Sequence, residues 1–200
     1  MITVILNRPE QIKARGIKKH LVRNAAHFIG QYGWFYGIAF IPLAEVFAIE
    51  FTVPVWTAIV ATILLNKAIT KTRVTSIILG LVGVFIILRP TTAIIHPAAF
   101  VVLVSAMAYG LSHTLTRSIV KQDSPLAVVF YMCLIQLPIG LALSFNDWIT
   151  PSGIIWFWLF LVGVTAMSAH YSMSKALSFA DAMVVIPMDF LRLPIIMLVG

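Results

Sequence analysis

Three ionisable residues lie inside long apolar stretches of the sequence, where a charge is costly. They are Glu50, Asp189 and Arg192. On insertion scales a charge at the centre of a membrane helix costs about 2.5 to 3.5 kcal/mol, so such residues usually face a cavity or a partner. Asp189 and Arg192 are three residues apart and share one helical face, which leaves two interpretations open. They form a structural ion pair, or they line the path of a solute.

Glu50 lies four residues before Pro54. A proline ring cannot accommodate the normal helical hydrogen bond to the carbonyl four residues earlier. This spacing predicts a carboxylate and a freed backbone oxygen close together near the middle of a membrane. A cavity-lining role and a role as a neutral or hydrogen-bonded structural acid both fit the pattern. A protonatable Glu50 could also couple transport to protons.

Uncharged polar and aromatic residues interrupt the apolar stretches as well. They are His27, Gln31, Tyr32, Tyr109, His113, Gln136, His170 and Tyr171. Hydrogen bonding between helices explains each of them taken alone. His113 and Tyr171 are the preferred solute-binding candidates, because an internal repeat places their helices near the centre. We find no Gly-rich phosphate loop, no metal-spaced His/Cys cluster and no Gly-x-Ser-x-Gly elbow, so we expect no metal, no cofactor and no enzyme.

The composition is typical of an integral membrane protein. Of the 200 residues, 60% are hydrophobic and 10% are charged, and the mean hydropathy is +1.00. A hydrocarbon core of about 30 Å requires roughly 20 helical residues. Seven stretches qualify as spans and predict an all-α, polytopic transmembrane bundle. The stretches are residues 24–42, 43–65, 73–89, 97–117, 126–145, 154–174 and 181–200.

The basic residues predict the orientation of these spans. Twelve of the 14 Lys and Arg residues fall in the segment before the first span or in alternate gaps, and only Arg89 falls in the other gaps. Basic residues of short loops are retained in the cytoplasm. The formal charge of +7 therefore reflects membrane topology, and we expect no nucleic-acid partner.

A weak internal repeat has an offset of about 140 residues. It relates Tyr32 to Tyr171, Phe40 to Phe179, and Pro54 to Pro194. The repeat unit would contain five spans, and an odd number inserts the second copy upside down, as in many transporters. Two such units need roughly 280 residues. We therefore expect about two further spans before residue 1 and one after residue 200.

Several short segments occur in order along the chain. They are Ile-Ala-Phe-Ile-Pro-Leu-Ala-Glu at 38–45, Phe-Thr-Val-Pro at 51–54, Gly-Leu-Val-Gly-Val at 80–84, Arg-Pro at 89–90, Ala-Leu-Ser-Phe-Ala-Asp-Ala at 176–182 and Ile-Pro-Met-Asp-Phe-Leu-Arg-Leu-Pro at 186–194. These segments resemble EamA-like permeases of the drug/metabolite transporter superfamily. One departure is Leu65-Asn66-Lys67, where the family commonly has Leu-Gly-Glu. No role of that glutamate can be carried over to Lys67.

The resemblance implies a ten-helix, inverted-repeat transporter of which this chain holds about seven spans. Residues 1–23 would be a cytoplasmic basic segment, 24–90 the remainder of the first repeat and 97–200 a truncated second repeat. The implied function is secondary-active transport of an amino-acid-like or cofactor-like solute by alternating access in the plasma (inner) membrane. The alternative is a non-transporting remnant or assembly subunit. Expected partners are the solute, the lipid bilayer, and a second copy or a complementary fragment.

Overall fold

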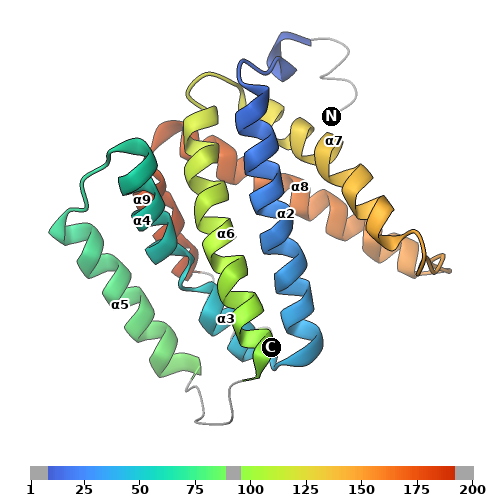
Figure 1. Cartoon of the computed structure of the whole chain (residues 1–200), viewed down its shortest axis with the longest axis horizontal. Helices are drawn as coiled ribbons and strands as arrows, with labels where there is room; N and C mark the ends of the chain where they lie inside the picture. Colours follow the sequence, from blue (N-terminus) through green and yellow to red (C-terminus); the bar gives the residue numbers. More distant parts are fainter. Residues whose placement is uncertain (1–8, 89–95, 192–200) are drawn as a thin grey trace. The chain divides into compact units, whose positions relative to one another are not determined.

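The computed structural model describes residues 9–88 and 96–191, and within these ranges all regular structure is helical (Figure 1). The elements are η1 (Pro9–Ile12), α2 (Ile17–Phe40), α3 (Leu43–Glu50), α4 (Val53–Leu65), α5 (Lys71–Leu88), α6 (Pro97–Ile119), α7 (Pro125–Ser144), α8 (Ile155–Phe179), α9 (Ala182–Val185) and η2 (Ile186–Leu191). The predicted all-α polytopic fold is confirmed.

Four helical segments are long and apolar enough to cross a membrane. They are Leu43–Leu65, Pro97–Ile119, Pro125–Ser144 and Ile155–Phe179. A shorter apolar segment, Ala182–Leu191, begins where the last span is predicted. The α2 helix begins at Ile17, so the end of the basic segment is helical and continuous with the first predicted span.

Local sequence explains where the helices start and stop. Ser124 caps α7 by accepting a hydrogen bond from the Ala127 N–H at 3.0 Å, and Pro125 follows at a position where its missing N–H costs nothing. At the other end of a helix, Asn66 ends α4 in the left-handed conformation, with φ of 49°. Asparagine tolerates this conformation better than most residues. These signals separate the apolar stretches into distinct helices.

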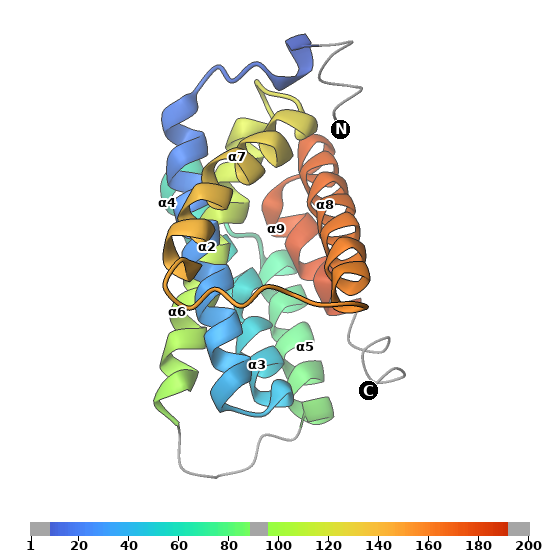
Figure 2. The same cartoon turned by 90° about the vertical axis from the view of Figure 1, so that its right-hand side faces the viewer.

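The span Leu43–Leu65 is broken into α3 and α4. The first helix ends at Glu50, the second begins at Val53, and Pro54 lies in the first turn of α4. Because a proline cannot continue the hydrogen-bonding pattern of a preceding helix, the break falls just before it. Figure 2 shows α3 beside α5, against which it packs.

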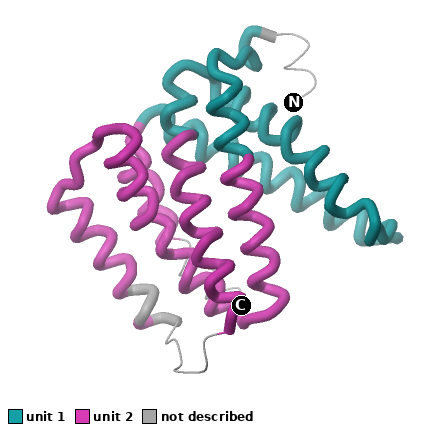
Figure 3. The backbone as a smooth tube through the Cα atoms, in the orientation of Figure 1, with its two compact units in different colours: residues 1–24, 116–179 teal, residues 25–115, 180–200 magenta. Residues whose placement is uncertain are grey.

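The described chain forms two compact units (Figure 3). Unit 1 comprises residues 1–24 and 116–179, and unit 2 comprises residues 25–115 and 180–200. Unit 1 therefore contains η1, the first part of α2, the end of α6, and the helices α7 and α8. Unit 2 contains the remaining helices and the broken span.

Unit 2 has two main hydrophobic clusters. One surrounds Val46 and Val102 and includes Ile41 and Ala98. The other joins α4, α5 and α9 through Ala58, Ala61, Ile77 and Met183. The short helix α9 is thus held by packing rather than by its own length, since isolated helices of a single turn are not stable.

In unit 1, α7 packs against α8, and Figure 2 shows the extended connection that joins these two helices. No residue in the most apolar 18-residue window of α8 is buried, although this helix carries Trp156, Phe157 and Phe160. A water-soluble protein rarely exposes such a large apolar surface. Hydrocarbon is the solvent that suits this face of α8.

Gly110 allows α6 to approach the backbone of α4. A Cβ atom added at Gly110 would lie 2.9 Å from the Thr57 nitrogen and 2.9 Å from the Trp56 carbonyl carbon. Gly110→Ala should therefore force the helices apart and lower the free energy of unfolding by about 1–3 kcal/mol, measured by thermal unfolding in detergent. Gly163→Ala in α8 is the control, because nothing lies within 4 Å of that position. Equal destabilisation by both substitutions would refute the close approach.

Candidate functional site

The break between α3 and α4 gathers several polar groups in unit 2. The Trp34 indole N–H donates to Oε2 of Glu50 at 2.8 Å. The Thr52 hydroxyl donates to the Ile49 carbonyl at 2.6 Å and accepts from the Trp56 indole N–H at 3.1 Å. Side chains thus supply hydrogen bonds where the helix is interrupted. Glu50 is half-buried and held by α2, so it is an anchored carboxylate at the end of a helix.

Two phenylalanines bring the broken span next to η2. The rings of Phe51 and Phe190 stack with centroids 5.6 Å apart and an interplanar angle of 28°. Phe51 is 1% exposed. Gly80 on α5 makes room for Phe190, because any side chain at Gly80 would collide with that ring. The residues that directly precede these two phenylalanines are Glu50 and Asp189, so the stack brings the chain segments of both acids together.

The histidine candidate lies on α6 in unit 2. His113 stacks on Tyr109 with ring centroids 6.2 Å apart, and Tyr109 meets His27 of α2 edge to face at 5.5 Å. Tyr109 also packs over Gly30, where an added Cβ would lie 2.9 Å from the ring. These three residues form a row of polar-tipped rings between α2 and α6. Such rings can pack against a solute as well as against each other.

The five predicted site residues are distributed unevenly. Glu50, His113 and Asp189 belong to unit 2, whereas Tyr171 belongs to unit 1 and is exposed on α8. Arg192 lies outside the described residues, and so the interpretations of Asp189 and Arg192 as an ion pair or as a solute path both stand. The structure connects the segments around Glu50 and Asp189, and assignment of all five residues as a binding site is a proposal.

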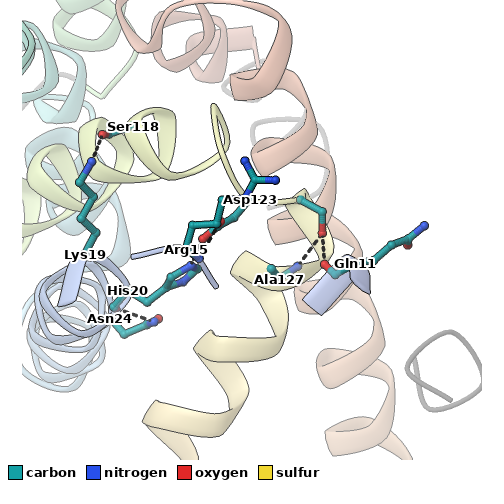
Figure 4. A network of polar contacts seen from close by, with 9 residues as sticks. Gln11, Arg15, Lys19, His20, Asn24, Ser118, Asp123 and Ala127 are labelled. Carbon is teal, nitrogen blue, oxygen red and sulfur yellow. Dashed lines mark hydrogen bonds and ion pairs between the residues drawn. The ribbon is translucent and has the colours of Figure 1, made fainter. Parts of the chain in front are cut away.

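Asp123 organises a polar network in unit 1 that sequence reasoning missed (Figure 4). Its carboxylate lies 2.9 Å from Nε2 of His20 and accepts from the Arg15 backbone N–H at 3.0 Å. Both Asp123 and His20 are buried. A carboxylate accepts hydrogen bonds, so this contact suits the His20 tautomer with the proton on Nε2. Nearby, the Ser124 hydroxyl donates to the Gln11 carbonyl and attaches η1 to the start of α7.

Asp181 has a similar position in unit 2. Its Oδ2 lies 3.3 Å from Nζ of Lys67 and 3.4 Å from an Nη atom of Arg73. Lys67 is the residue that departs from the family pattern, and here its positive charge faces an acid. The contact joins the α4–α5 connection to the start of α9. All three side chains are partly exposed, so this pair is worth less than a buried one.

Charge counting would have drawn attention to both acids. The chain has only seven Asp and Glu residues against 14 Lys and Arg residues. Asp123 and Asp181 each lie a few residues after a lysine, Lys121 and Lys175, so an ion pair is expected near each of them. The sequence could not show which basic residues would be chosen, because the partners lie more than 100 positions away along the chain.

The fold and these buried polar groups define a polytopic helical membrane protein. The chain belongs to the EamA-like transporter family, whose model matches residues 5–89 and 96–199. The chain is also similar to the S-adenosylmethionine uptake transporter of Rickettsia prowazekii, with 27% identity over 88% of this chain and 60% of the relative. No solved structure matches it significantly.

Two riboflavin transporters are similarly related. The protein of Vibrio cholerae is 28% identical over 90% of this chain and 61% of its own length. The protein of Rhizobium johnstonii is 29% identical over 91% of this chain and 61% of its own length. The chain thus spans about 60% of the length of the curated relatives named here.

The Asp123 network yields a stability prediction. Asp123→Asn leaves one acceptor oxygen where the carboxylate has two, so the Arg15 N–H or the His20 N–H loses its acceptor. We expect the free energy of unfolding to fall by about 1–3 kcal/mol, measured by thermal unfolding in detergent. The matched control is Asp147→Asn in the exposed α7–α8 connection, which should have little effect. An unchanged unfolding temperature for Asp123→Asn would show that the network does not stabilise unit 1.

Proposed function

We propose that this protein carries a small metabolite across the plasma (inner) membrane by alternating access, with a solute site at the broken span of unit 2. The family assignment supports transport as the activity. The names of the relatives support a cofactor-like solute, since those proteins are described as transporters of S-adenosylmethionine and of riboflavin. An amino-acid-like solute is the other class that the mixed charges would suit.

One observation carries the location of the site. Glu50 and Asp189 are 139 residues apart, as are Phe51 and Phe190. This is the offset that relates Tyr32 to Tyr171 and Phe40 to Phe179. The two stacked phenylalanines are therefore equivalent positions of the proposed repeats, and equivalent residues that touch each other lie on the axis that relates the repeats. Transporters built from inverted repeats bind their solutes near that axis.

Each proposed repeat also has an interrupted helix in the segment that follows its long helix. The first repeat has the break between α3 and α4, and the second changes from α9 to a 3-10 helix at Ile186, which corresponds to Phe47 of α3. Both follow long helices that end in phenylalanine, Phe40 in α2 and Phe179 in α8. Paired interruptions of this kind leave helix ends and backbone groups facing the solute.

The roles of the residues follow from this arrangement. Glu50 and Asp189 supply negative charge for a cationic or zwitterionic solute, and Phe51 and Phe190 supply a flat apolar surface. His113 would line the path from α6, and Arg192 would balance the charge of Asp189. Tyr171, on α8 of unit 1, stays a solute-binding candidate on the sequence pattern alone. Movement of the two repeats about the fixed site would open it to each side in turn.

Glu50 provides the decisive test. In proteoliposomes, Glu50→Gln should lower saturable uptake of labelled S-adenosylmethionine or riboflavin about tenfold, which corresponds to the loss of one charge-assisted hydrogen bond. The control is Glu45→Gln in the first turn of the same helix, which should retain uptake. Full dependence of uptake on a pH gradient in Glu50→Gln would exclude this residue as the coupling site.

The same assay separates the proposal from its alternative. The Rickettsia and Vibrio relatives serve as positive controls for the two labelled solutes. Saturable uptake by this chain would support a working transporter, alone or as a homo-oligomer. Uptake by the relatives without uptake by this chain would favour a non-transporting subunit, or one that needs a complementary fragment.

A further inference from the structure

A buried arginine in unit 1 lies outside the site proposed above. Arg23 of α2 is 3% exposed. Its Nε donates to the Thr116 hydroxyl at 3.1 Å, and one Nη donates to Oδ1 of Asn24 at 2.8 Å. Asn24 and Thr116 are themselves 0% and 2% exposed. The sequence pattern places Arg23 among the basic residues that set topology, but such residues normally lie in water.

Arg23 has no carboxylate partner among the residues that the structure describes. All seven Asp and Glu side chains fall within residues 9–88 and 96–191, and in these ranges none of them forms a hydrogen bond or an ion pair with Arg23. A guanidinium has five N–H groups. Two of them are bonded to the neutral oxygens of Thr116 and Asn24, and the others have no acceptor in the described part of the chain.

Further polar groups lie around Arg23. The Gln136 side-chain amide of α7 donates to the same Asn24 oxygen at 3.2 Å. Asn24 in turn donates to the His20 carbonyl at 2.8 Å, which fixes its orientation. Groups from α2, α6 and α7 therefore converge around one positive charge.

A buried cation without a counter-ion is unfavourable, because the cost of removing it from water is several kcal/mol and no attraction offsets it. A membrane protein can retain such a charge if a ligand supplies the anion. Guanidinium groups suit this role, since their fork of donors matches the two oxygens of a carboxylate or a phosphate. Thr116 and Asn24 hold the fork in position without neutralising it.

We infer that Arg23 binds an anionic group, a carboxylate or a phosphate, of the transported solute. This inference rests on the proposed function and adds a substrate class to it. Of the two solutes named for the relatives, S-adenosylmethionine has an ionised carboxylate and riboflavin has no acidic group that ionises at neutral pH. Arg23 therefore favours a solute of the first kind.

The first test uses simple anions, so that it does not depend on transport. The purified chain is placed in nanodiscs of phosphatidylcholine, and its unfolding temperature is measured in phosphate, acetate and chloride at equal ionic strength. Phosphate or acetate should raise the unfolding temperature of the wild type above its value in chloride, and Arg23→Gln should abolish this difference. The matched control is Lys18→Gln, which removes an exposed positive charge from the same helix and should preserve it. An equal response of wild type and Arg23→Gln would overturn the inference.

A fold control accompanies this experiment. In chloride alone, Arg23→Gln should unfold at the same temperature as the wild type or above it, because the substitution removes an uncompensated buried charge. A clear decrease would instead assign Arg23 a structural role and overturn the inference. Arg23→Lys keeps the charge but loses the fork, so it should show an intermediate response to phosphate and acetate.

The second test identifies the source of the anion. S-adenosylmethionine should bind the wild type about tenfold or more tightly than it binds Arg23→Gln, and its decarboxylated analogue should bind both proteins equally. Nanodiscs that contain phosphatidylglycerol test the lipid source. If anionic lipid stabilises the wild type but not Arg23→Gln while S-adenosylmethionine binding is unaffected, the anion is a lipid phosphate and the solute assignment is wrong. If the wild type shows no uptake but phosphate or acetate still raises its unfolding temperature, the proposed transport function is contradicted and anion binding by Arg23 is not.

Discussion

The absence of water around most of this chain is the constraint on which its structure depends. In hydrocarbon, every backbone N–H and C=O group must find its partner within the protein, and a helix satisfies these groups within one segment. Apolar stretches of about 20 residues have the length of helical spans. Where the helix breaks at Phe51 and Thr52, side chains replace the lost pattern. The Thr52 hydroxyl donates to the Ile49 carbonyl, and the Trp34 indole holds Glu50.

The same constraint makes acidic residues scarce and gives them structural influence. Asp123 joins the N-terminal segment to the connection between α6 and α7, and Asp181 joins the α4–α5 connection to the start of α9. Each of these acids faces two donors, which is a natural result in a chain with twice as many basic as acidic residues. Because the acids are few, the buried Arg23 is left without one among the described residues.

Function in such a protein depends on places where the helical pattern or the charge balance fails. The broken span and the Phe51–Phe190 stack interrupt the helical pattern in unit 2. The Arg23 environment leaves the charge balance incomplete in unit 1. Interruptions and unbalanced charges both lower stability, and a solute that supplies the missing interactions can recover part of this cost. The proposed sites are of these two kinds.

The sequence by itself determined that the chain lies in lipid, that it is helical and where its spans approximately fall. Hydropathy and the need for about 20 residues per span can be read from each short stretch of sequence. It also indicated the break before Pro54, since a proline restricts the helix that precedes it. Only the tertiary structure decided that Asp123 pairs with His20, that Phe51 stacks on Phe190 and that Arg23 is buried with no acidic partner in the described ranges. These outcomes depend on which helix faces are brought together, and residues about 100 or more positions apart carry no local signal of their contact.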